Sequence, residues 1–203
     1  MQGNERKERS DKKKPISPYI DSSSYELVSL LSYICGLPIK TIGEMLAREG
    51  MKADAILDQI KVHFRRDFIV DEARFCIGHP ELKPFRLKLP ADKKRLAMRF
   101  FQFEHDRFAA LSYALDCSVQ MSVGLIIEKA LSRKDILFKI LSRGLIPHIS
   151  PGRMKQIKVI CSLLNDRSPE FYITSQMVIA TLLKDSIQNQ RKIDRTMDVW
   201  LHN

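Results

Sequence analysis

The sequence lacks the motifs that usually mark an enzyme. Its four cysteines, Cys35, Cys76, Cys117 and Cys161, lie far apart with no CxxC pair, which is typical of free thiols in a reducing compartment. It contains no P-loop, no GxSxG or HExxH motif and no paired acidic cluster of the nuclease type. We therefore predict no catalytic residues, no cofactor and no small-molecule substrate.

Metal-ligating residues are also sparse. His63, Cys76 and His79 give a CxxH spacing at 76–79, but a fourth ligand is not obvious, and zinc sites usually have paired ligands on both sides. His105 and Asp106 are adjacent, and neighbouring residues on a helix point to different sides. We predict no metal site and no acid–base pair here.

Long apolar runs are missing too. No run approaches the roughly 18 residues of a membrane span. The first residues, "MQGNERKERSDKKK", are charged throughout, and no apolar segment of a secretory signal follows them. We expect a cytoplasmic protein without membrane contact, and a disordered basic arm over residues 1–20.

What the chain has in excess is positive charge. It has 34 Lys and Arg residues against 24 Asp and Glu, a formal net charge of +10 over 203 residues. Such an excess favours an anionic partner, most often nucleic acid. The alternative is a basic protein whose charge serves only solubility.

Glycine is scarce, and apolar residues recur at helical spacing through most of the chain. These features predict a mainly α fold with helix-turn-helix units and one or two short strands around residues 68–90. We divide the chain into a disordered basic arm (1–20), an N-terminal helix-turn-helix domain (21–80), a basic linker or short strand (81–95), a second related helical unit (96–147) and a C-terminal helical pair with a tail (148–203).

The two helical units are related to each other in sequence. "LSYIC" at 31–35 matches "LSYAL" at 111–115, and "AILDQI" at 55–60 matches "DILFKI" at 135–140. Both matches are 80 residues apart. The pattern indicates a duplicated unit, and a chance match between helical sequences is the alternative.

The segment "VSLLSYICGLPIKTIGEML" (28–46) has the features of two helices joined by a tight turn. Ser32 is a small residue at a close crossing, and Gly36 suits a turn that needs positive φ. The segment resembles the helix-turn-helix of bacterial regulators over its whole length. An ordinary helical hairpin is the alternative.

The resemblance to the helix-turn-helix implies that Ile39 to Arg48 is a recognition helix. On this interpretation four side chains point outward to base edges and phosphates: Lys40, Thr41, Glu44 and Arg48.

A second segment, "PFRLKLP" (84–90), alternates apolar and basic residues. It is similar to the strand that opens ribbon-helix-helix repressors of the Arc type, and residues 113–127 suit the link to that fold's second helix. The resemblance implies that Arg86 and Lys88 read bases in the major groove. The spacing to Ser118 is longer than that family's first helix, and a charge-protected edge strand is the alternative.

Basic residues cluster around this segment, and with two arginines further upstream they would form a phosphate-binding stripe whose affinity falls with salt. The stripe comprises Arg65, Arg66, Arg86, Lys88, Lys93, Lys94, Arg95 and Arg99. A solvated surface is the alternative. The stretch "MRFFQFEHDRF" (98–108) that follows predicts a helix with its phenylalanines in the core, because its apolar residues recur every three to five positions.

The function that these features favour is non-enzymatic, sequence-specific binding of double-stranded DNA. The protein would be a regulator or an accessory factor of plasmid or phage maintenance or transfer, acting as a homodimer or as an internal pseudo-dimer. The contrasting hypothesis is a helical protein–protein adaptor, with the apolar stripes "LIIEKAL" (125–131) and "MVIATLL" (177–183) as docking surfaces.

Overall fold

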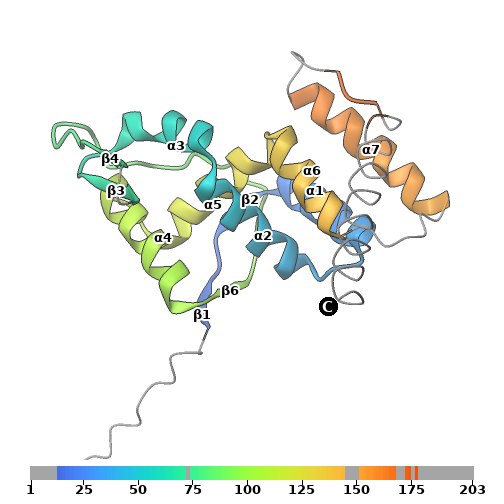
Figure 1. Ribbon diagram of the computed structural model, residues 1–203, viewed down its shortest axis with the longest axis horizontal. Helices are drawn as coiled ribbons and strands as arrows, with labels where there is room; N and C mark the ends of the chain where they lie inside the picture. The colour runs from blue at the N-terminus through green and yellow to red at the C-terminus, as the bar shows by residue number, and fades with distance from the viewer. Residues whose placement is uncertain (1–12, 72–73, 145–150, 168–171, 175–176, 178–203) are drawn as a thin grey trace, which may run out of the picture.

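The chain folds mainly into helices, as the sequence predicts (Figure 1). The structure, a computed structural model, describes residues 13–71, 74–144, 151–167, 172–174 and 177. Its helices are α1 (Ser22–Cys35), α2 (Ile39–Lys52), α3 (Asp54–Ile60), α4 (Gln102–Leu115), α5 (Val119–Leu131), α6 (Lys134–Gly144) and α7 (Pro151–Arg167). Its strands are β1 (Lys14–Ile16), β2 (Tyr19–Asp21), β3 (Phe68–Asp71), β4 (Arg74–Cys76), β5 (Lys93–Arg95) and β6 (Met98–Phe100).

Strands β3 and β4 form the small hairpin expected within the 68–90 region. The expected strand at 84–90 is wrong, because residues 83–90 have no regular secondary structure. No neighbouring strand accepts their hydrogen bonds: the Phe85 N–H donates to the Leu115 carbonyl, and the Leu87 N–H donates to Met121 Sδ. The segment is extended, but it lies across the start of α5 instead of in a sheet.

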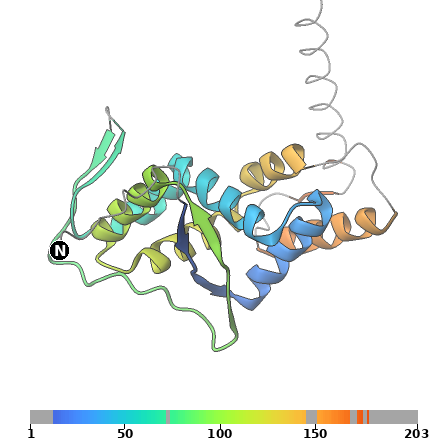
Figure 2. The same cartoon turned by 90° about the horizontal axis from the view of Figure 1, so that it is seen from below.

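The remaining four strands form one antiparallel ribbon. β1 pairs with β6 and β2 pairs with β5 in the same register, from Lys14 opposite Phe100 to Asp21 opposite Lys93. Between the two pairs the Leu96 N–H donates to the Pro18 carbonyl. Figure 2 shows the two strands side by side beneath the helices. We refer to residues 13–21 and 93–101 together as the ribbon.

The disordered arm expected over residues 1–20 therefore does not extend into residues 14–20, which lie in or between strands. The reason is a short period-two pattern within a charged sequence. Ile16 and Ile20 are fully buried beneath the ribbon, with Pro18 between them. Residues 1–12 lie outside the described part of the chain.

The order of elements repeats 80 residues along the chain. A ribbon strand, two helices and a third helix (13–60) are followed by the same series at 93–144. The axes of α1 and α2 bend by 108°, and those of α4 and α5 bend by 96°. Both bends contain a residue with positive φ, Gly36 at 63° and Asp116 at 53°. The two units are related by a two-fold axis through the middle of the ribbon.

The first bend has the turn chemistry that the sequence indicates. Gly36 takes the left-handed conformation, the Leu37 N–H donates to the Ser32 carbonyl, and Ser32 Oγ donates to the Leu37 carbonyl. In the second unit Asp116 takes the place of the glycine, and its carboxylate pairs with Arg65 and Arg66.

The core is continuous across both units, because the second helices α2 and α5 cross at its centre. At the crossing a Cβ on Gly50 would lie 2.7 Å from Ile126 Cγ2 and 3.2 Å from Ala130 Cβ. The stripe at 125–131 is part of this core, since Leu125, Ile126 and Leu131 are all buried. The expectation that it is a docking surface is therefore wrong.

The stretch 98–108 is only partly helical. Residues 98–100 form β6, and α4 begins at Gln102. Phe100 and Phe108 are buried and meet edge to face with ring centroids 5.0 Å apart, as a core role predicts. Phe101 and Phe103 are exposed instead and stack on each other. The change from strand to helix at Phe101 turns these two rings outward.

Helix α7 lies where the sequence predicts the first helix of the C-terminal pair. The expected second helix and the stripe at 177–183 lie almost wholly outside the described residues. Within the described part of the chain, no single helix has the length and hydropathy needed to cross a bilayer, although α1 joined with α2, and α4 joined with α5, meet that test as bent pairs.

Candidate nucleic-acid interface

The ribbon has one buried and one exposed face, because side chains alternate along both strands. The buried face comprises Ile16, Pro18, Ile20, Leu96, Met98 and Phe100. The outward face comprises Lys13, Pro15, Ser17, Tyr19, Asp21, Lys93, Arg95, Ala97, Arg99 and Phe101, most of them exposed. Four cations and a single acid therefore share this face.

Aromatic rings hold cations at both ends of the outward face. Lys13 Nζ lies 4.6 Å from the centroid of the Phe101 ring. At the other end Lys93 Nζ lies 5.3 Å, and Arg95 Cζ 5.9 Å, from the Tyr19 centroid. Tyr19 remains 49% exposed, so each end offers a ring and positive charge together.

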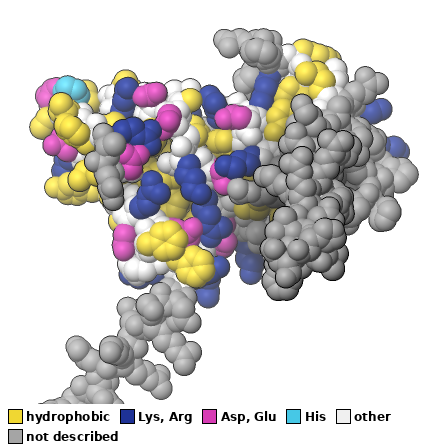
Figure 3. Space-filling model, in the orientation of Figure 1, with side chains coloured by type: hydrophobic (Ala, Val, Ile, Leu, Met, Phe, Trp, Pro, Cys, Tyr) yellow, Lys and Arg dark blue, Asp and Glu magenta, His cyan; other side chains and the backbone are white. Residues whose placement is uncertain are grey.

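The dimensions of the ribbon suit a duplex groove. Two paired strands lie about 4.8 Å apart, and the major groove of B-DNA is about 12 Å wide, which admits a two-stranded ribbon. The centre of the outward face carries only the small side chains of Ser17 and Ala97. Figure 3 shows lysine and arginine side chains gathered between α4 and α2 and down towards β1 and β6.

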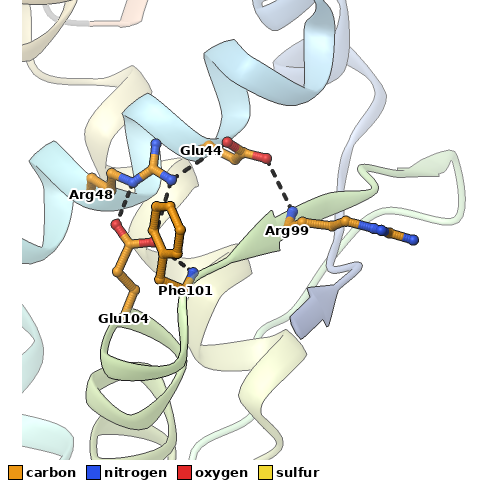
Figure 4. A network of polar contacts seen from close by, with 5 residues as sticks. All are labelled: Glu44, Arg48, Arg99, Phe101 and Glu104. Carbon is orange, nitrogen blue, oxygen red and sulfur yellow. Dashed lines mark hydrogen bonds and ion pairs between the residues drawn. The ribbon is translucent and has the colours of Figure 1, made fainter. Parts of the chain in front are cut away.

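A polar network from α2 and α4 holds one end of the ribbon in place (Figure 4). Glu44 Oε1 accepts the backbone N–H of Arg99 at 3.1 Å. Arg48 pairs with Glu104 and reaches Glu44 Oε2 at 3.5 Å. Glu104 Oε2 also accepts the Phe101 N–H at 3.0 Å, which caps α4. The network binds the backbone of Arg99 and leaves its side chain pointing away from the cluster.

The charges of this network are matched. Burial alone would raise the pKa of Glu104, but hydrogen bonds from Arg48 and the Phe101 N–H, with the nearby charges of Arg48 and Lys13, hold that pKa below its ordinary value. Burial would lower the pKa of Arg48, and its contacts with Glu104 and Glu44 raise it instead. Both groups therefore stay ionised at neutral pH.

A related contact holds the other end of the ribbon. Glu128 on α5 accepts the Asp21 N–H at 2.9 Å and the Ser24 hydroxyl at 2.6 Å. Glu128 and Ser24 correspond to Arg48 and Glu104 in the repeat. In both units, a polar residue on the second helix ties down the start of the other unit's first helix.

The proposed recognition helix lies differently from the expectation. Glu44 is buried, with 8% of its surface exposed, so the prediction that it points outward is wrong. Arg48 is half-buried in the network with Glu104 and Glu44, and Thr41 is half-buried. Only Lys40 of the four is exposed. The cause is the packing of α2 against both α5 and β6, which a single helix-turn-helix would not have.

Arg65 and Arg66 lie far from the ribbon end of α4, at its carboxyl end. Both pair with Asp116, and Arg66 Nη1 also donates to the Tyr113 carbonyl at 2.7 Å. The hydrogen bonds from Arg66 and Arg65 lower the pKa of Asp116. These arginines therefore do not join a single stripe with residues 93–99.

The remaining predicted cations divide into two groups. Lys93, Arg95 and Arg99 lie on the outward face of the ribbon, and exposed Lys94 lies beside it, 5.5 Å from the Tyr25 ring centroid. Arg86 and Lys88 are exposed on the extended segment that crosses α5. Residues 13–21 were missed as a strand, although alternating Ile16, Pro18 and Ile20 were a usable signal.

No other chemistry emerges among the described residues. No group of three or more His, Cys, Asp and Glu residues there is arranged to hold a metal ion. His63 packs against the Phe85 ring, and His79 pairs with Glu81.

No protein-family model, curated protein or solved structure matches this chain. The functional argument therefore rests on the geometry of the molecule itself.

Proposed function

We propose that this protein binds double-stranded DNA by placing the outward face of the ribbon in the major groove. The observation that carries the proposal is the ribbon itself. It presents Lys13, Lys93, Arg95 and Arg99 around a small centre, with the apolar side chains turned into the core. Arginine suits guanine edges, and all four cations suit phosphates.

The arrangement supports the ribbon in preference to α2 as the reading element. Ribbon-helix-helix repressors, which the sequence resembles at 84–90, use paired strands in this way. Here the pairing strands lie at 14–21 and 93–100, and each is followed by two helices. Both strands come from one chain, so the internal pseudo-dimer supplies a complete reading element, and no homodimer is needed for it.

The proposed role is non-enzymatic, that of a cytoplasmic regulator or an accessory factor of plasmid or phage maintenance or transfer. The test is a titration of random duplex DNA at two salt concentrations. We expect affinity to fall with salt, with a slope of about −0.9 per phosphate contact. Binding that is micromolar or weaker and independent of salt would overturn the proposal.

One observation favours the adaptor as a second candidate. The β3–β4 hairpin projects from the helices (Figure 2) and exposes Ile69 and Phe75, with Ile77 beside it. Ile69 and Phe75 are cross-strand partners, so the exposed apolar surface is continuous. Loss of a protein partner with Ile69→Asp, and no salt-dependent duplex binding by the native chain, would favour the adaptor.

A further inference from the structure

The ribbon is symmetric in its backbone but unequal in its outward side chains. The two-fold axis passes between Ser17 and Ala97, because the register of both strand pairs places these residues opposite each other. Every ribbon position has its counterpart 80 residues away. The caps follow the same rule, with Asp21 before α1 and Phe101 before α4.

Positions that serve the fold keep their character under this symmetry. Ile16 and Leu96 are equivalent and buried, as are Ile20 and Phe100. The buried face therefore conserves apolar character across the two units, and the centre of the outward face keeps small side chains.

The outward positions beside the centre do not keep their character. Pro15 corresponds to Arg95, and Tyr19 corresponds to Arg99. One half of the ribbon presents Pro15 beside Arg99, and the other presents Tyr19 beside Arg95. Each half thus has one arginine, at positions that the two-fold axis does not relate. At the ends, Phe101 corresponds to Asp21, which also changes charge.

We infer that the ligand of this ribbon is a non-palindromic duplex site, read by one copy of the chain. The inference rests on the proposed function. A palindrome presents the same base edges to both halves of a two-fold reader. Because bidentate arginine contacts select guanine, whereas proline has no donor, the two halves of this ribbon select different bases at related positions. One chain supplies both strands, so both half-sites are read in a single binding event.

The test is enrichment of bound sequences from a random duplex pool, followed by the stoichiometry of binding to the enriched site. We expect an enriched site without dyad symmetry, bound by one chain. Arg95→Ala should relax the base preference in one half-site and Arg99→Ala in the other, each by roughly tenfold or more. In a palindromic reader each substitution would relax both halves.

A symmetrised variant provides the converse test. Pro15→Arg with Tyr19→Arg places arginine at all four positions beside the centre, and both native side chains are exposed. This variant should enrich a site with dyad symmetry. A palindromic site bound by two native chains would overturn the inference and leave DNA binding intact. Failure of the native chain to bind any duplex would instead overturn the proposed function.

Discussion

Glu44 is the residue at which the two accounts of DNA reading differ most sharply. If α2 were an exposed recognition helix, Glu44→Ala would change base selection and leave the fold intact. In the structure Glu44 is buried and accepts the backbone N–H of Arg99. Glu44→Ala should therefore destabilise the protein.

The magnitude follows from the contacts that are lost. An N–H left without its acceptor in a partly buried site costs about 1–3 kcal/mol. The lost ion pair with Arg48 adds little, about 0.2–1 kcal/mol, because Arg48 keeps Glu104 as its partner. We expect a loss of about 2 kcal/mol in the free energy of unfolding.

Urea denaturation followed by circular dichroism measures this loss. Asp58→Ala is the matched control, because it removes a carboxylate that is 66% exposed and pairs only with Lys61 at i+3. That change should stay within about 0.5 kcal/mol of the native chain. Equal stability of the two variants would refute the assignment of Glu44 to the ribbon support.

Two further predictions concern stability. The pKa of Glu104 is lower in the folded chain than its ordinary value, so its stabilising effect is present above about pH 4.3 and is lost as the pH falls through the folded pKa. Glu104→Gln should therefore be less stable than the native chain at pH 7, and this difference should shrink in urea titrations below about pH 4; a constant difference would contradict the ion pair. Gly50→Ala should lower stability by about 1 kcal/mol, because overpacking against Ile126 costs about 1–3 kcal/mol while helix propensity returns about 1. Lys52→Ala, at an exposed position of the same helix, is its control, and a Gly50→Ala variant as stable as that control would contradict the close crossing.

Much of the helical architecture follows from sequence patterns. The break at Gly36 and Pro38 separates α1 from α2 because glycine permits the left-handed turn, and Ser150-Pro151 marks the start of α7. The 80-residue offset between "LSYIC" and "LSYAL" is also the offset between the elements of the two units.

The ribbon could not be found by the same means. Each strand has three residues in regular pairing on either side of a break, and its partner lies about 80 positions away in the chain. Such pairing depends on tertiary packing, which local patterns do not encode. The charge of Lys13 and Lys14 hid the apolar period, while Arg86 and Lys88 offered a clearer alternation in a segment without a partner strand.

The burial of α2 has a similar cause. Its apolar face predicts one packed side, whereas the duplicated unit supplies a second neighbour, α5, and the ribbon supplies a third. Glu44 on the face towards the ribbon is satisfied by Arg99 and Arg48, contacts that only the folded pair of units creates.

The ribbon's role as the reading element is tested most directly by comparing two double variants on a duplex enriched by the native chain. Arg95→Ala with Arg99→Ala removes two cations from the ribbon, and Arg86→Ala with Lys88→Ala removes two exposed cations outside it. We predict that the ribbon variant loses at least about 30-fold in affinity for the enriched duplex and no longer prefers it over random duplex. The control should keep that preference. Retained preference in the ribbon variant, with loss in the control, would contradict the account.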